Sequence, residues 1–300
     1  MSFPYLSAII FLPAIGSIII AFLGGNRPRL TKYLAALFTL ASFILSLVIF
    51  AVFDRSAGAS GAFQFEEKAL WIPPLGAHYH LGMDGLNLPM VVLTAFLGFM
   101  VVLISWKENL RVREHFAWLL LLETSILGVF SSLDLLLFFV FWEIELIPMY
   151  FIIAVWGTGR RQYSAIKYVI YTLFGSAFIL AGILCLYFTT GSLSMVDSSP
   201  GGRALITTAI PAAVIFFFLL IGFAVKLPVV PLHTWLPDAH TDAPTAGSVM
   251  LAGALIKMGG YGMIRVSVSL FPEVARTYAP LLVILAVITD LYGAALTLRQ

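Results

Sequence analysis

Four ionisable side chains lie inside long apolar runs of this sequence, and their types suit them to proton transfer. Glu143 and Glu145 lie in the run 138–150 (FFVFWEIELIPMY), Lys226 lies in IGFAVKLP, and Lys257 lies in LAGALIKMGG. A charged side chain at the centre of a bilayer costs about 2.5–3.5 kcal/mol on insertion scales, so such residues are rare unless they have a function. Acids and bases buried in neighbouring membrane spans predict a proton path.

The two carboxylates are expected on opposite sides of one helix. Glu143 lies about nine residues into its span, which places it near mid-membrane at about 1.5 Å per residue. Glu145 follows two residues later, about 200° around a regular helix. The two acids are therefore not expected to reach one partner, and either of them can instead be a structural member of an ion pair. Pro148 predicts a kink close by.

The two lysines lie in unusual surroundings. Pro228 and Pro231 follow Lys226, and their missing N–H groups predict a broken seventh helix. Broken helices at membrane depth line protein or water, and in transporters they mark the transport path. The break would leave Lys226 at the negative C-terminal end of a half-helix. A buried lysine such as Lys257 can release and regain a proton near neutral pH, with static pairing as the alternative.

Further acids and histidines are candidates for a relay or a supporting role. Glu123 lies midway in the expected fourth span, and Asp290 lies in the ninth. His233 and His240 flank the predicted break, and histidine titrates near pH ~6.5. The alternative for each of these residues is a structural hydrogen bond.

The composition identifies a polytopic membrane protein with an all-α fold. Hydrophobic residues make up 61% of the 300 and charged residues only 11%, against roughly half and a quarter in soluble domains. The net charge of +2 gives no reason to expect a nucleic-acid partner. Cys185 is the single cysteine, and CxxC pairs or His/Cys clusters at ligand spacing do not occur. We therefore expect no cofactor and no metal in this chain.

Nine apolar runs are long enough to span a bilayer. They fall at about 4–23, 33–53, 85–105, 115–131, 134–156, 166–189, 206–226, 246–269 and 279–298. Residues 131–134 alone separate the fourth and fifth runs, which predicts a tight helical hairpin. The first run precedes its basic residues, so we expect a retained anchor and not a cleaved signal peptide.

The basic residues predict the orientation of the spans. With the loop that carries Arg27, Arg29 and Lys32 inside, ten Lys and Arg residues fall inside and four outside. Such a bias places the N-terminus outside. The longest loop, 54–84, then lies outside, and its Asp84 is expected to cap the following helix or to take part in docking.

Three motifs of this chain resemble the antiporter-like subunits of respiratory complex I. They are FFVFWEIELIPMY, then VKLP…HTWLPDAH…APTAGS from residue 225, then LIK ending at Lys257. The resemblance covers essentially all 300 residues and is closest to the chain 4 branch (NuoM and NdhD). The second acid, Glu145, resembles the cyanobacterial and chloroplast NdhD form.

The resemblance implies a proton-translocating membrane-arm subunit of an NAD(P)H or ferredoxin–plastoquinone oxidoreductase (NDH-1), a translocase without a redox centre of its own. It implies that Glu143 pairs with Lys226 and that Lys257 continues a polar axis. The implied partners are other membrane-arm subunits and the lipid bilayer, with quinone bound elsewhere in the complex. The implied location is a cyanobacterial thylakoid membrane, or otherwise a bacterial plasma membrane.

The resemblance also suggests a division of the chain. Residues 1–110 hold helices 1–3 and the external loop, residues 111–275 form the antiporter-like bundle, and residues 276–300 begin a second, incomplete bundle. Two alternatives stay open. One is a subunit of a multisubunit cation/proton antiporter of the Mrp type, and the other is a mainly structural membrane-arm subunit.

Overall fold

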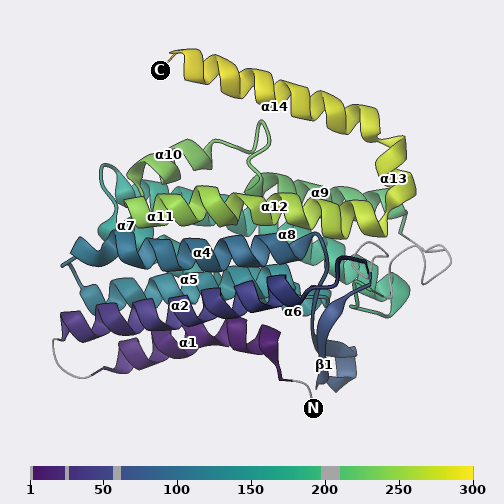
Figure 1. Cartoon of the computed structure of the whole chain (residues 1–300). Helices are drawn as coiled ribbons and strands as arrows, with labels where there is room; N and C mark the ends of the chain where they lie inside the picture. Colours follow the sequence, from purple (N-terminus) through teal and green to yellow (C-terminus); the bar gives the residue numbers. More distant parts are fainter. Residues whose placement is uncertain (1–2, 24–26, 57–61, 197–209, 300) are drawn as a thin grey trace.

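A computed structural model describes residues 3–23, 27–56, 62–196 and 210–299 as a layered bundle of antiparallel helices (Figure 1). The predicted all-α class is confirmed. The elements that matter below are α1 (Tyr5–Phe22), α2 (Pro28–Val52), β1 (Gln64–Ile72), β2 (Ala77–Met83), α4 (Asn87–Ile104), α5 (Val112–Ser131), α6 (Leu135–Ile144), α7 (Leu146–Trp156), α8 (Arg161–Thr190), α9 (Ala212–Lys226), α10 (Trp235–Asp242), α11 (Thr245–Met250), α12 (Ile256–Gly262), α13 (Pro272–Thr277) and α14 (Ala279–Arg299).

Seven helical segments of the described chain are long and apolar enough to cross a membrane. They match seven of the nine expected spans, and the chain is an integral, multi-pass membrane protein. The two expected spans outside these seven are the fourth and the seventh. The fourth is α5, which carries Arg113 and Glu114 in its first turns and Glu123 further on. The seventh is α9, which is only 15 residues long in the described chain, and residues 206–209 of that expected span lie outside the described residues.

The loop 54–84 contains a β-hairpin that the sequence analysis did not predict. Strands β1 and β2 pair antiparallel, and Gly76 closes their turn with φ +61°, a left-handed conformation that glycine adopts without strain. The hairpin docks on α1, because the Glu67 carboxylate accepts hydrogen bonds from the backbone N–H groups of Leu6 (2.7 Å) and Ser7 (3.1 Å). It therefore satisfies donors that the start of α1 leaves free.

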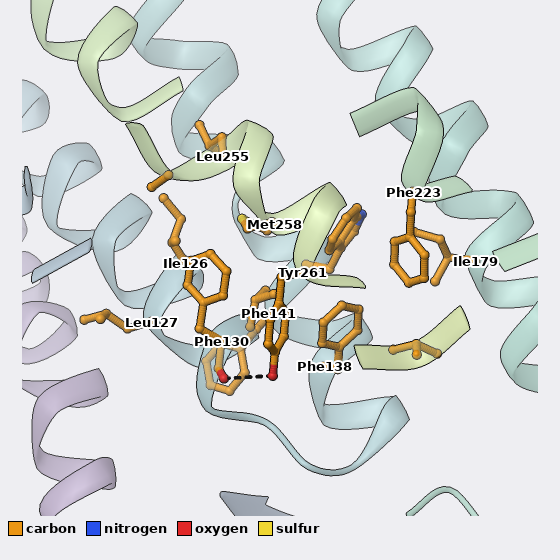
Figure 2. Packing of buried hydrophobic residues seen from close by; sticks show 14 of the residues in the cluster. Ile126, Leu127, Phe130, Phe138, Phe141, Ile179, Phe223, Leu255, Met258 and Tyr261 are labelled. Carbon is orange, nitrogen blue, oxygen red and sulfur yellow. Dashed lines mark hydrogen bonds between the residues drawn. The ribbon is translucent and has the colours of Figure 1, made fainter. Parts of the chain in front are cut away.

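Aromatic side chains fill the centre of the bundle (Figure 2). Phe138 of α6 meets Phe223 of α9 edge to face, with ring centroids 6.1 Å apart. Phe130 of α5 meets Tyr261 of α12 in the same way at 5.2 Å, and the Tyr261 hydroxyl donates to the Phe130 carbonyl (3.2 Å). These contacts fix α9 and α12 against the α5–α6 hairpin, which turns at residues 132–134 as predicted.

Three of the spans are not continuous α-helices. Glu145 alone separates α6 from α7 within one span, and its backbone stays in the right-handed helical region (φ −66°, ψ −23°). Helix α9 ends at Lys226 and α10 begins at Trp235, which confirms the predicted broken seventh helix. The eighth span contains two π-helical segments, Leu251–Leu255 and Met263–Val268, on either side of α12. These breaks set the positions of the buried charges.

The loops expected on the inner side share one end of the bundle. The Lys32 ammonium donates to the Trp106 carbonyl (2.7 Å), and the Lys167 ammonium donates to the Asp238 carboxylate (2.7 Å). The amide N–H of Thr158 donates to the Asp242 carbonyl (2.8 Å). We call this the basic end, and we call the opposite end, which carries the β1–β2 hairpin, the hairpin end. Successive loops along the chain alternate between the two ends, as the charge pattern predicts. Which end faces inside stays a prediction.

Candidate functional site

A buried ion pair joins the two broken spans. The Lys226 ammonium, on the last residue of α9, donates to the Oε1 atom of Glu145, which lies at the junction of α6 and α7. The side chains are 2% and 0% exposed. Two charges removed from water stabilise each other only where the geometry is good and the remaining polar atoms are satisfied.

Tyr168 of α8 provides further hydrogen bonds for the polar atoms of Glu145 and Lys226. Its hydroxyl donates to Oε2 of Glu145 (2.9 Å) and accepts from the Lys226 ammonium (3.3 Å). The same ammonium lies 5.3 Å from the centroid of the Tyr168 ring and 5.7 Å from that of Trp142. The ion pair is therefore a cluster that three neighbouring segments build together. The sequence analysis did not select Tyr168, because a tyrosine near the start of an apolar helix carries no distinguishing signal.

The break after Lys226 is held open by specific contacts. The indole N–H of Trp235 donates to the Val225 carbonyl (2.8 Å), which replaces a helical bond lost at the break. A Cβ atom on Gly259 of α12 would lie 2.6 Å from the backbone nitrogen of Leu227, so only glycine fits there. These contacts let α12 approach the end of α9 and fix where the Lys226 side chain starts.

The expected Glu143–Lys226 ion pair is wrong for this structure, because Lys226 pairs with Glu145. That expectation came from the family resemblance, which implies the first acid of the motif as the partner, whereas here the second acid, at the junction of α6 and α7, holds the lysine. Glu143 is half-buried beside the cluster. The polar groups that neighbour its carboxyl are those of Ser176, Glu145 and Lys226. Its Oε1 atom is buried without a hydrogen-bond partner among the described residues.

Lys257 is exposed in this chain, which corrects the expected burial. Its ammonium donates to the carbonyl of Ala252 (2.8 Å), five residues earlier in the π-helical segment. The irregular turn leaves that carbonyl accessible to the Lys257 ammonium. The structure does not bring Lys257 into contact with the Glu145–Lys226 pair, and its role in transport stays a prediction.

Glu123 is the most isolated acid of the described chain. Its side chain is 1% exposed, and neither carboxylate oxygen has a hydrogen-bond partner among the described residues. It packs on Gly98 of α4, where a Cβ atom would lie 2.3 Å from the carboxyl carbon. A buried polar group without a hydrogen-bond partner costs free energy. Its relay role stays a prediction.

The two histidines occupy different surroundings. His233, in the break, has a buried Nδ1 atom without a described partner, and its ring meets that of Tyr292 at 5.0 Å. His240, in α10, is exposed. Asp290 is also exposed, on α14, which lies apart from the main layers (Figure 1). A relay through His233 or His240 stays a prediction.

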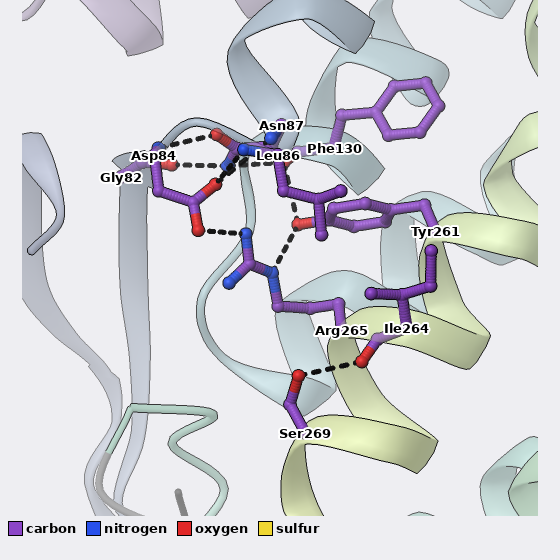
Figure 3. A network of polar contacts seen from close by, with 9 residues as sticks. All are labelled: Gly82, Asp84, Leu86, Asn87, Phe130, Tyr261, Ile264, Arg265 and Ser269. Carbon is purple, nitrogen blue, oxygen red and sulfur yellow. Dashed lines mark hydrogen bonds and ion pairs between the residues drawn. The ribbon is translucent and has the colours of Figure 1, made fainter. Parts of the chain in front are cut away.

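A second polar network lies at the hairpin end (Figure 3). The Arg265 guanidinium, in the second π-helical segment, contacts the Asp84 carboxylate at 2.5 Å and donates to the Tyr261 hydroxyl (3.2 Å). The Asn87 side-chain amide and the Tyr261 hydroxyl both donate to the Phe130 carbonyl. Asp84 accepts a hydrogen bond from the backbone N–H of Asn87 at the start of α4, and it also binds Arg265 of the eighth span. Both roles expected for Asp84, helix capping and docking, are therefore present.

The fold and the site define a class of protein. It is a multi-pass helical membrane protein in which two broken spans hold a buried acid–base pair, an arrangement suited to moving protons or cations. The chain belongs to the NADH:quinone oxidoreductase/Mrp antiporter transmembrane family, whose model matches residues 132–300.

Relatives and solved structures agree with this family. The chain is 40% identical over 300 residues to NAD(P)H-quinone oxidoreductase chain 4 3 of Picosynechococcus, covering 97% of this chain and 52% of the relative. It is 40% identical to NADH-ubiquinone oxidoreductase chain 4 of Arabidopsis thaliana, covering 98% and 59%.

A solved structure titled respiratory complex I from Thermus thermophilus with bound NADH contains a similar chain. The TM-score is 0.81 at 28% identity, covering 97% of this chain and 58% of the other. The chain spans between about half and three fifths of the length of these relatives.

Proposed function

We propose that this chain is a proton-translocating membrane subunit of an NAD(P)H–quinone oxidoreductase type complex. The observation that carries the proposal is the Glu145–Lys226 pair, fully buried at the junction of two broken spans. Membership of the family and the names of its relatives support it. In this proposal the chain has no redox centre of its own, and quinone reduction in other subunits drives it.

The pair can act as a proton gate through electrostatics alone. While Glu145 and Lys226 are in contact, each stabilises the charged form of the other. If a movement of α9 or of the α6–α7 junction separates them, Lys226 loses its counter-charge and gives up a proton more readily, while Glu145 binds one more readily. Tyr168 contacts both groups and lies where a proton would pass between them.

The other candidate residues would extend the route. Glu143 has an unpartnered carboxyl oxygen beside the pair and is the proposed next proton site. We propose that Lys257 continues the route along the eighth span, with Glu123, His233 and His240 as supporting groups. Other membrane-arm subunits and the bilayer are the proposed partners.

A finer form of the proposal assigns the chain to a photosynthetic complex (NDH-1) that uses plastoquinone in a thylakoid membrane. The cyanobacterial relative supports it, but the Arabidopsis NADH-ubiquinone relative is equally similar at 40% identity. Purified complex would be assayed with ferredoxin and with NADH as electron donors. Activity with ferredoxin and not with NADH supports the photosynthetic form, and the reverse result contradicts it.

An antiporter subunit of the Mrp type is the second candidate, and the family description names it alongside the first. The two functions differ in what drives transport. A Na⁺ gradient applied to vesicles would move protons through an antiporter in the absence of any electron donor. A mainly structural subunit would leave proton uptake unchanged when Lys226 is neutralised.

Proton uptake by membrane vesicles during quinone reduction tests the proposal. Lys226→Met removes the buried ammonium, and Lys107→Met removes an exposed one at the basic end. We expect Lys226→Met to abolish most proton uptake per quinone reduced, while Lys107→Met retains it. Subunit assembly is measured in the same membranes. Assembled Lys226→Met vesicles with normal uptake would contradict the proposal.

A further inference from the structure

A surface cavity of about 350 Å³ lies at the basic end, and none of the residues that line it belongs to the buried ion pair. It lies between the start of α2 and the residues that follow α4. It is lined by Pro28, Arg29, Lys32, Tyr33, Trp106 and Asn109. Its volume falls in the range of about 300–1,000 Å³ that small-molecule sites occupy.

The cavity is positively charged and lacks an acid among the described residues. Lys32 is 9% exposed, and its ammonium donates to the Trp106 carbonyl, which leaves two further N–H donors. The Arg29 side chain is exposed. Neither cation forms an ion pair with a described carboxylate, although a buried charge is costly without one. The N-terminus of α2 adds the positive end of its helix dipole to the cavity. The site therefore fits an anion.

An apolar stripe leads from the cavity along α2. Tyr33 is 64% exposed, Leu37 60% and Ile44 51%, at spacings that place them on one helix face. Tyr33 and Trp106 meet edge to face at 5.3 Å beside the two cations. Tyrosine and tryptophan are the residues enriched where a membrane meets water, and exposed aliphatic residues beyond them are suited to contact with acyl chains.

We propose that this cavity binds the phosphate of an anionic glycerophospholipid, with an acyl chain along Leu37 and Ile44. Basic pockets between transmembrane helices on the inner side suit such head groups. The stripe distinguishes a lipid from a free phosphate, because a free phosphate would use only Arg29 and Lys32. The lipid would supply the counter-charge that the described residues do not provide for Lys32.

Lipid binding to the purified, delipidated complex tests the proposal. The probes are phosphatidylglycerol, phosphatidylcholine of the same chain length, and glycerol 3-phosphate, and retained lipid is counted by native mass spectrometry. Arg29→Gln/Lys32→Gln removes both cations of the cavity. Lys107→Gln/Arg160→Gln removes two exposed cations from the same end outside the cavity and is the matched control. Arg29→Gln alone serves if the double variant fails to fold.

The expected result is selective binding of phosphatidylglycerol to the unmodified protein and to the control. In Arg29→Gln/Lys32→Gln the affinity is expected to fall roughly thirtyfold, the factor for two charges at a membrane surface, and about fivefold in Arg29→Gln. Equal binding of phosphatidylcholine, or an unchanged affinity in both cavity variants, overturns the proposal. Competition by glycerol 3-phosphate at the affinity of the lipid also overturns it, because the site would then take a free phosphate.

Discussion

The Lys226 ammonium is held by three different kinds of group: a carboxylate, a phenol hydroxyl and two aromatic rings. Each of them offsets part of the cost of removing a charge from water, and none of them does so alone. Loss of one member of such a buried pair is destabilising by about 3–5 kcal/mol, because the other charge stays behind. In the proposed mechanism, a displacement that separates Lys226 from Glu145 would change which of the two groups holds the proton.

Tyr168→Phe tests the contribution of the phenol without changing the packing. The hydroxyl bonds both Glu145 and Lys226, so its loss leaves one oxygen of a buried carboxylate unsatisfied. We expect a loss of about 1–3 kcal/mol in the free energy of unfolding and slower proton uptake. Thermal unfolding in detergent and uptake by vesicles measure the two effects.

Tyr163→Phe on the same helix is the control, since Tyr163 is 51% exposed. It should change neither quantity. If Tyr168→Phe behaves like this control in both measurements, the hydroxyl is not part of the site.

At the scale of elements, close packing of α8 against α9 positions the pair. A Cβ atom on Gly222 would lie 2.6 Å from the carbonyl oxygen of Gly175 and 2.4 Å from a side-chain carbon of Ile179. Small residues at such crossings let membrane helices approach closely. Gly222 lies one helical turn before Lys226, so the crossing and the ion pair are mechanically linked.

Gly222→Ala is expected to push α9 away from α8. Overpacking of this kind is destabilising by about 1–3 kcal/mol, and the displaced lysine would lose contact with Tyr168. Unfolding temperature and proton uptake should both fall. Gly293→Ala, on α14 with open space around it, should leave both unchanged. A fully active and stable Gly222→Ala protein would show that the crossing tolerates movement.

The sequence predicted the elements better than their contacts. Hydropathy located the spans, and the two prolines after Lys226 located the broken helix, because both signals act locally. The partner of Lys226 was predicted wrongly, because the resemblance implied Glu143 and the sequence does not show which of the two acids faces the lysine. Tyr168 was missed because only the arrangement of three helices brings it to the pair.

At the scale of the molecule, the hairpin end ties the first three spans to the eighth. The Arg265–Asp84 contact joins the second π-helical segment to the loop before α4, with side chains 12% and 14% exposed. π-Helical segments are often found at functional sites. The hairpin end therefore holds the second π-helical segment of the eighth span, and Lys257 lies in α12 of the same span.

A double-mutant cycle with Asp84→Asn and Arg265→Gln measures that link. The contact is largely buried, so we expect a coupling energy of about 1–3 kcal/mol in the free energy of unfolding. The exposed pair Glu273 and Arg276 gives a matched cycle in which coupling should be close to zero. Equal coupling in the two cycles would show that the network does not hold the eighth span.

In the proposed function, proton transfer passes through the Glu145–Lys226 pair. Glu145→Gln removes the charge that holds Lys226, whereas Glu143→Gln leaves the pair in place and removes a carboxyl beside it. The direct measurement is proton uptake per quinone reduced, in vesicles with equal amounts of assembled complex. We predict that Glu145→Gln loses most uptake and that Glu143→Gln loses less. Normal uptake in assembled Glu145→Gln vesicles would contradict the claim.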